Sequence, residues 1–113
     1  MAGTWLLVAI AVVCNSLAQL MMKRAGVTDA FSWRQWVEPT LLAAVGLYGL
    51  SFVLTALVFA RLPLSLASPL MAGAIFVLVS LFSVVFLAES IGPLRLAGMA
   101  CIVVGIVLLA RSA

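Results

Sequence analysis

The chain has 113 residues, of which 67% are hydrophobic and 8% are charged, and its formal net charge is +3. Soluble domains are about half apolar and about a quarter charged, so a soluble fold would leave most of this protein's surface apolar. The six basic residues are scattered along the chain without a soluble domain to gather them, which argues against nucleic-acid binding.

Four apolar runs follow one another, and each is close to the roughly 20 residues that a spanning helix needs. We expect transmembrane helices at about 4–22, 40–60, 64–88 and 93–110, so that residues 1–113 form a single transmembrane domain. The runs are too long for barrel strands and do not alternate. The first run is followed by Lys23 and Arg24 instead of a small-residue cleavage site, which favours a permanent span over a signal peptide. The predicted fold class is an all-α membrane protein with four transmembrane helices.

The connections between these runs predict how the helices follow one another. The short segments 61–63 and 89–92 predict two antiparallel hairpins, and 25–39 is the longer loop. Tryptophans near the ends of spans suit the headgroup layer, as at Trp5, Trp33 and Trp36. One side of the membrane would hold four basic residues, Lys23, Arg24, Arg34 and Arg95, and the other side two, Arg61 and Arg111. Because basic residues favour the cytoplasmic side, this distribution weakly favours both termini outside the cytoplasm. Insertion in both orientations is the alternative.

The chemistry of an enzyme or a metal site is missing from this sequence. The chain contains no histidine, and its two cysteines, Cys14 and Cys101, fall inside apolar runs. They offer neither a disulfide framework nor the ligand spacing of a metal site, so we expect no metal and no cofactor. Because no nucleophile, base and acid come together, we do not expect an enzyme.

Polar side chains inside the runs are the candidates for function, because such groups usually face a bundle interior or a cavity at membrane depth. The predicted substrate-binding residues are Asn15, Gln19, Tyr48, Ser51, Ser68 and Glu89. Asn15 and Gln19 are four residues apart and share a helix face, where bonding between helices is as consistent with the pattern as ligand contact. The serines could bond to their own helix backbone, and Glu89 could be an acid favoured by a helix dipole.

Small residues in the fourth run predict association between subunits. A monomer of four helices encloses little volume, and helices in lipid associate through small residues that allow close approach. Ala97, Cys101 and Gly105 follow at four-residue spacing, and Gly98 lies on nearly the same face. We expect a dimer seam along these four residues; packing within one subunit is the alternative.

Several segments together resemble a known family. These are Met21-Met22-Lys23 at the end of the first run, Tyr48 with Ser51-Phe52, Leu62-Pro63, and the stretch 98–107. In order and spacing they are similar to the small multidrug resistance proteins of the drug/metabolite transporter superfamily, over nearly the whole chain. The resemblance implies a dimeric, multi-pass transporter in a bacterial inner membrane.

The chain departs from the drug exporters of that family at their functional positions. Eight residues before the lysine of the first helix, where those exporters have a glutamate, this chain has Asn15. Their tyrosine and tryptophan of the third helix fall at Ser68 and Met71. Since asparagine has no proton to exchange, the departure argues against proton-coupled drug export.

Another branch of the superfamily fits the sequence better. The chain resembles subunits of the flippase for aminoarabinose-phosphoundecaprenol at Ser16 and Gln19 before Lys23, at Pro69, and at Glu89 followed by Pro93 and Gly98. The resemblance implies a flippase for a lipid-linked substrate of the polyprenyl-phosphate type. Two alternatives remain: a transporter of a small polar metabolite or cation, and a non-transporting subunit that partners another membrane protein. The dimer could join identical or different four-helix chains.

Overall fold

The computed structural model describes residues 2–28 and 31–112, and its elements are all helices over those ranges. They are α1 (Ala2–Ala25), α2 (Trp33–Trp36), α3 (Pro39–Phe59), α4 (Leu64–Phe86) and α5 (Pro93–Ser112). The four long helices are apolar and long enough to cross a membrane, which confirms the predicted fold class. The short helix α2 was not predicted; it lies in the longer loop, where the Arg34 guanidinium sits 5.8 Å from the centre of the Trp33 ring.

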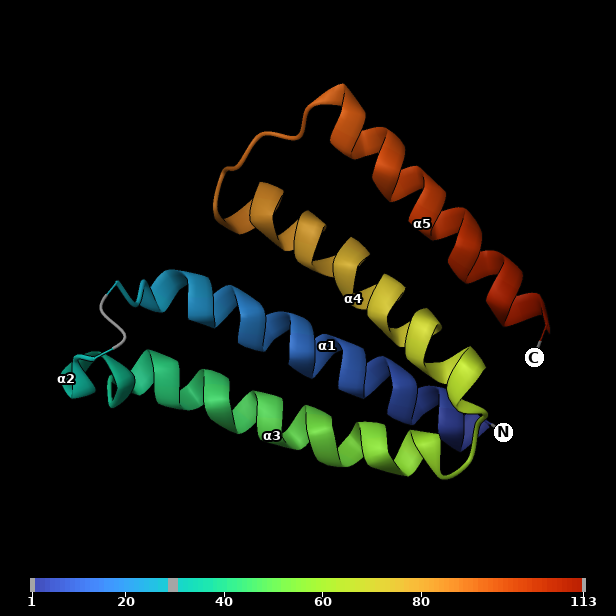
Figure 1. Cartoon of the computed structure of the whole chain (residues 1–113), viewed down its shortest axis with the longest axis horizontal. Helices are drawn as coiled ribbons and strands as arrows, with labels where there is room; N and C mark the ends of the chain where they lie inside the picture. The colour runs from blue at the N-terminus through green and yellow to red at the C-terminus, as the bar shows by residue number, and fades with distance from the viewer. Residues whose placement is uncertain (1, 29–30, 113) are drawn as a thin grey trace.

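The four long helices lie side by side in the order α3, α1, α4, α5 (Figure 1). Helix α1 is central and packs against both α3 and α4, whereas α5 packs against α4. The Cα positions extend over 46 × 36 × 21 Å, so the arrangement is flat. Because successive long helices run in opposite directions, α1 and α4 end at the same membrane face, where residues 26–28, 31–38 and 87–92 also lie.

The buried core lies toward the other membrane face. It joins the first half of α1 to the end of α3 and the start of α4, through Val8, Ala11, Val12, Val58, Ala67, Leu70 and Met71. Pro69 lies inside α4 between the core residues Ala67 and Leu70, and its own side chain is exposed. The ends of α1 and α4 extend beyond this core, and that is where the two helices leave room for a cleft.

Helix α5 approaches α4 at a glycine. A Cβ atom added at Gly73 would lie 2.9 Å from Ile106 Cγ1 and 3.3 Å from Ile102 Cγ2. Any side chain at this position would require Ile106 to shift, so Gly73 lets the two helices pack closely. On its other faces α5 is open, and none of its residues is buried. In water such a helix would expose a large apolar surface, whereas in a bilayer it faces lipid or another protein chain.

Candidate functional site

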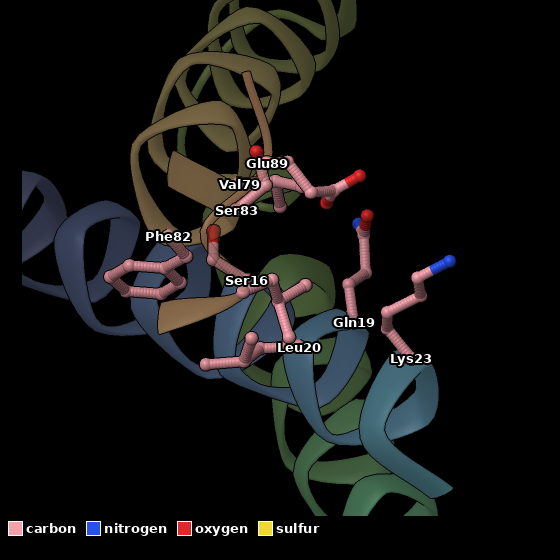
Figure 2. A pocket seen from close by; sticks show the side chains of 9 residues that line it. Ser16, Gln19, Leu20, Lys23, Val79, Phe82, Ser83 and Glu89 are labelled. Atoms are coloured by element: carbon pink, nitrogen blue, oxygen red, sulfur yellow. The ribbon is translucent and has the colours of Figure 1, made fainter. Parts of the chain in front are cut away.

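A cleft of about 290 Å³ opens between the end of α1 and the end of α4. Its lining residues come from α1 (Ser16, Gln19, Leu20 and Lys23), from α4 (Val79, Phe82 and Ser83) and from the following loop (Leu87 and Glu89). Figure 2 shows that the polar ends of Gln19, Lys23 and Glu89 point toward the same opening. The cleft therefore combines a cation, a carboxylate and an amide at one membrane face.

Part of the wall of this cleft is apolar, beside the polar residues named above. Leu20 and Val79 line it together with Phe82 and Leu87. The Phe82 ring packs edge-on against Phe86, with ring centroids 5.7 Å apart and an angle of 65° between the rings. This contact holds the aromatic ring in the wall. A molecule in the cleft would thus meet hydrocarbon along its length and charge at one end.

Glu89 reaches the cleft because of the backbone at the end of α4. Ala88 has a φ angle of 53°, in the left-handed region that a residue with a side chain rarely adopts. This turn ends the helix, and the Glu89 N–H donates to the Ser83 carbonyl at 3.1 Å. The helix ends at Phe86, before the expected residue 88, and the two residues released from it carry Glu89 over the cleft.

Arg24 ties the two sides of the cleft together at its rim. Its Nη2 donates to the Phe86 carbonyl at 3.2 Å, which joins the last turn of α1 to the last residue of α4. The carbonyls in the last turn of a helix lack partners within the helix, so a guanidinium satisfies one of them here. Lys23, the neighbour of Arg24, is left to face the cleft.

Asn15 lies one helical turn before Gln19 on α1 and bonds to α3. Gln19 Nε2 donates to Asn15 Oδ1 at 2.8 Å, and Asn15 Nδ2 donates to Ser51 Oγ at 3.4 Å. The Ser51 hydroxyl in turn donates to the Ala11 carbonyl at 3.2 Å. These bonds form a continuous chain from the cleft to the interface between α1 and α3. Asn15 and Ser51 therefore join helices, and Gln19 connects their bonds to the cleft.

This chain of bonds predicts a stability effect. Ser51→Ala should lower the free energy of unfolding by about 0.6 kcal/mol, because it removes an interhelical bond and leaves the Asn15 amide without this acceptor. Ser80→Ala is the matched control, since the Ser80 hydroxyl donates to Phe76 of its own helix at 2.8 Å. Equilibrium unfolding in mixed micelles with sodium dodecyl sulfate measures both. Equal losses in the two variants would contradict the interhelical role of Ser51.

Two predicted site residues lie away from this cleft. Tyr48 is half-buried on α3, which α1 separates from α4, and it is not among the cleft's lining residues. Ser68 is exposed near the start of α4. It precedes Ser83 by 15 residues, and the rise of a helix puts about 22 Å between them. Of the predicted set, the structure brings Gln19 and Glu89 into one cleft and bonds Asn15 to Ser51.

Three polar residues of the cleft were not among the predicted site residues: Ser16, Lys23 and Ser83. A signal for Lys23 was present, because Lys23 follows the first apolar run and Glu89 follows the third. Alternate spans end at the same membrane face, so these two charges had to share that face. Ser16 and Ser83 gave no comparable signal. Their hydroxyls donate to carbonyls of their own helices, at 2.7 Å to Val12 and at 2.9 Å to Ser80.

Glu89 also lines a second cleft, of about 280 Å³, between α4 and α5. The other polar residues of this cleft are Ser80, Ser83, Ser90 and Arg95. Glu89 thus stands between two openings at the same membrane face. The predicted seam residues continue along α5 from here: Ala97, Gly98 and Cys101 are exposed, and Gly105 is partly exposed.

Four membrane-spanning helices with an amphiphilic cleft at one face define a small multi-pass membrane protein. Residues 3–102 match the family described as Small Multidrug Resistance protein, and the chain belongs to this family. It is 31% identical over 109 residues to the Multidrug resistance protein EbrA of Bacillus licheniformis. The aligned region covers 96% of this chain and 97% of that protein. A protein of the same name from Bacillus subtilis is 30% identical over 105 residues, or 93% of each chain.

Membership of this family fixes the general activity. The protein is a transporter and not an enzyme, and it is a multi-pass protein of the inner membrane. The resemblance to small multidrug resistance proteins that the sequence suggested is confirmed at the level of the family. The substrate is a separate question, which depends on the cleft.

Proposed function

We propose that this transporter is a flippase for a lipid-linked substrate of the polyprenyl-phosphate type, as in the aminoarabinose-phosphoundecaprenol branch. The observation that carries the proposal is the cleft between α1 and α4, where an apolar wall ends at Lys23 and Glu89. A lipid tail would pack along Leu20 and Phe82, and the head would meet the two charges. A purely hydrophilic solute would gain nothing from that wall.

The two charges suit a headgroup that contains both a phosphate and a polar sugar. The Lys23 ammonium would pair with the phosphate, and the Glu89 carboxylate would accept hydrogen bonds from amine or hydroxyl groups. Gln19 lines the cleft between them in the view of Figure 2. Because the cation and the carboxylate offset each other, the cleft has no strong preference for a simple cation.

Asn15 supports a mechanism without proton exchange at that position. Its amide does not titrate, and it is engaged with Gln19 and Ser51. The two relatives described above are named multidrug resistance proteins. The family's drug exporters have a glutamate at the position of Asn15, so we do not extend drug/proton exchange to this chain.

A dimer would complete the transport path. The cleft is open to one membrane face, and a subunit this flat cannot surround a polar head by itself. The exposed small residues of α5, Ala97, Gly98, Cys101 and Gly105, offer the seam along which a second chain of the same kind, identical or related, would pack. Rocking of the two subunits about this seam would expose the substrate alternately to each face.

Translocation of a fluorescent polyprenyl-phosphate sugar in reconstituted vesicles tests the proposal. Lys23→Gln should lower the rate about fivefold, since one interfacial cation contributes about 1 kcal/mol toward an anionic lipid. Arg34→Gln is the matched control, because Arg34 lies at the same membrane face but outside the cleft, and it should leave the rate unchanged.

Three outcomes would contradict this proposal. No translocation above empty vesicles, alone or with a related four-helix chain, would point to a non-transporting partner subunit. Uptake of a water-soluble metabolite or cation without lipid movement would favour the small-solute alternative, for which the second cleft with Glu89 and Arg95 is the candidate site. Equal rates in the Lys23 and Arg34 variants would remove Lys23 from the mechanism.

A further inference from the structure

The largest of the clefts described here, about 600 Å³, lies at the opposite membrane face from Glu89. Its lining comes from the start of α1, the turn between α3 and α4, and the last turns of α5. In Figure 1 these segments lie at the side of the molecule where N and C are marked. Its lining residues are Trp5, Arg61, Leu62, Pro63, Ser65, Leu66, Ala110 and Ser112. The core residues Val8, Ala67 and Leu70 lie between this cleft and the middle of the membrane.

The charge of this cleft differs from that of the cleft beside Glu89. Among its described lining residues Arg61 is the one charged side chain, so no carboxylate there offsets the guanidinium. A guanidinium presents a planar set of donors that matches the oxygens of a phosphate. The cleft is therefore complementary to an anion, whereas the first cleft combines both signs.

The uncharged lining residues select a lipid over a free anion. Leu62, Leu66 and Ala110 provide an apolar surface next to Arg61, and Trp5 adds an indole whose N–H can meet a headgroup. Ser65 contributes a hydroxyl to the lining of the same cleft. Free phosphate would contact only the polar part, while a lipid would also cover the apolar part with an acyl chain.

The start of α4 adds to the positive potential of the cleft. Pro63 caps this helix without a side-chain hydrogen bond, and the Pro63 carbonyl accepts bonds from Leu66 and Ala67. The N–H groups of Leu64 and Ser65 come before the first N–H groups that are bonded within the helix, and they lie at the positive end of the helix dipole. This end reinforces the preference for an anion that Arg61 already sets.

We propose that the cleft formed by Trp5, Arg61, Ser65 and Leu66 binds a phospholipid with a net negative headgroup. The phosphate lies against the Arg61 guanidinium, and an acyl chain covers Leu62, Leu66 and Ala110. This site is separate from the cleft of the proposed flippase, and it does not depend on what the protein transports. Its lipid would fill the space between the α3–α4 turn and the end of α5.

Quenching of Trp5 fluorescence tests this proposal directly. Trp33→Phe and Trp36→Phe leave Trp5 as the single tryptophan of the full chain. The protein is reconstituted in phosphatidylcholine vesicles that contain the same fraction of brominated phosphatidylglycerol or brominated phosphatidylcholine. We expect about a fivefold higher apparent affinity for the anionic lipid, the contribution of one basic residue near a membrane surface.

Two further variants distinguish lipid binding in this cleft from a general attraction of anionic lipid to basic residues at the membrane surface. Arg61→Gln should remove the preference, and Arg111→Gln, which removes a charge at the same face but outside the cleft's lining, should keep it. Circular dichroism and gel filtration show that each variant is folded. The proposal would be contradicted if both lipids quenched Trp5 equally in the single-tryptophan protein. It would also be contradicted if both arginine variants lost the preference for the anionic lipid to the same extent. Loss of the preference on adding inorganic phosphate, at a sodium chloride-matched ionic strength, would show that a free anion occupies it instead.

Discussion

Gly73→Leu should separate α5 from α4 and lower the free energy of unfolding by about 3 kcal/mol, at the upper end of the cost of overpacking. The Cβ atom alone would lie 2.9 Å from Ile106 Cγ1 and 3.0 Å from Ile106 Cδ1. Alanine could be accommodated by a shift of the flexible Ile106 side chain. Leucine adds three more carbons at the same point, which Ile102 and Ile106 cannot both avoid. Because α5 packs on α4, the contact at Gly73 is one of those that position α5.

The measurement is equilibrium unfolding in a micelle excess that keeps the chain monomeric. Gly98→Leu is the matched control, since nothing lies within 4 Å of a Cβ added at Gly98. It should leave the stability of the subunit unchanged. If α5 forms the proposed seam, the same variant should weaken cross-linking between exposed Cys101 residues in vesicles. Equal destabilisation by the two leucines would show that the contact at Gly73 is not special.

Glu89→Gln should lower the rate of lipid-linked sugar translocation about tenfold, the effect of losing one charge-assisted hydrogen bond of about 1.5 kcal/mol. The substitution keeps the shape of the side chain, removes its charge and replaces one acceptor oxygen with a donating NH2 group. Glu89 lines both clefts at this membrane face, so a headgroup in either cleft would meet it. Among the described residues Ser83 also lines both clefts, but its side chain is uncharged.

Glu38→Gln provides the matched control for Glu89→Gln. Glu38 is an exposed carboxylate at the same face, immediately before α3, and its side chain makes no capping hydrogen bond. Its substitution removes the same charge from the membrane surface without touching either cleft. Asn15→Ala, measured beside them, tests whether the interhelical bonds also affect transport. Wild-type rates in the Glu89 variant would exclude this carboxylate from the transport mechanism.

The amino-acid sequence was sufficient to predict a protein of four transmembrane helices and the order of its spans and connections. Four apolar runs of this length, separated by short polar segments, are best interpreted as four transmembrane helices. In a bilayer the backbone N–H and C=O groups have no water to bond with, and a helix satisfies them within each run. The ends of the spans were predictable for the same reason, since Lys23, Pro39, Pro63 and Pro93 mark where a helix meets the interface or begins. The family resemblance followed from the order and spacing of a few segments within these spans.

The tertiary structure alone decided which polar residues face a cleft. Asn15 and Gln19 share one helix face, yet Asn15 bonds to α3 while Gln19 lines the opening toward α4. That division depends on α1 lying between α3 and α4, which the periodicity of one helix cannot specify. In the same way, the serines of α4 looked equivalent in the sequence, but the length of the helix places Ser68 and Ser83 at opposite membrane faces. The periodicity of a helix predicts which of its residues share a face. Which helix, cleft or lipid that face contacts depends on how the helices pack together.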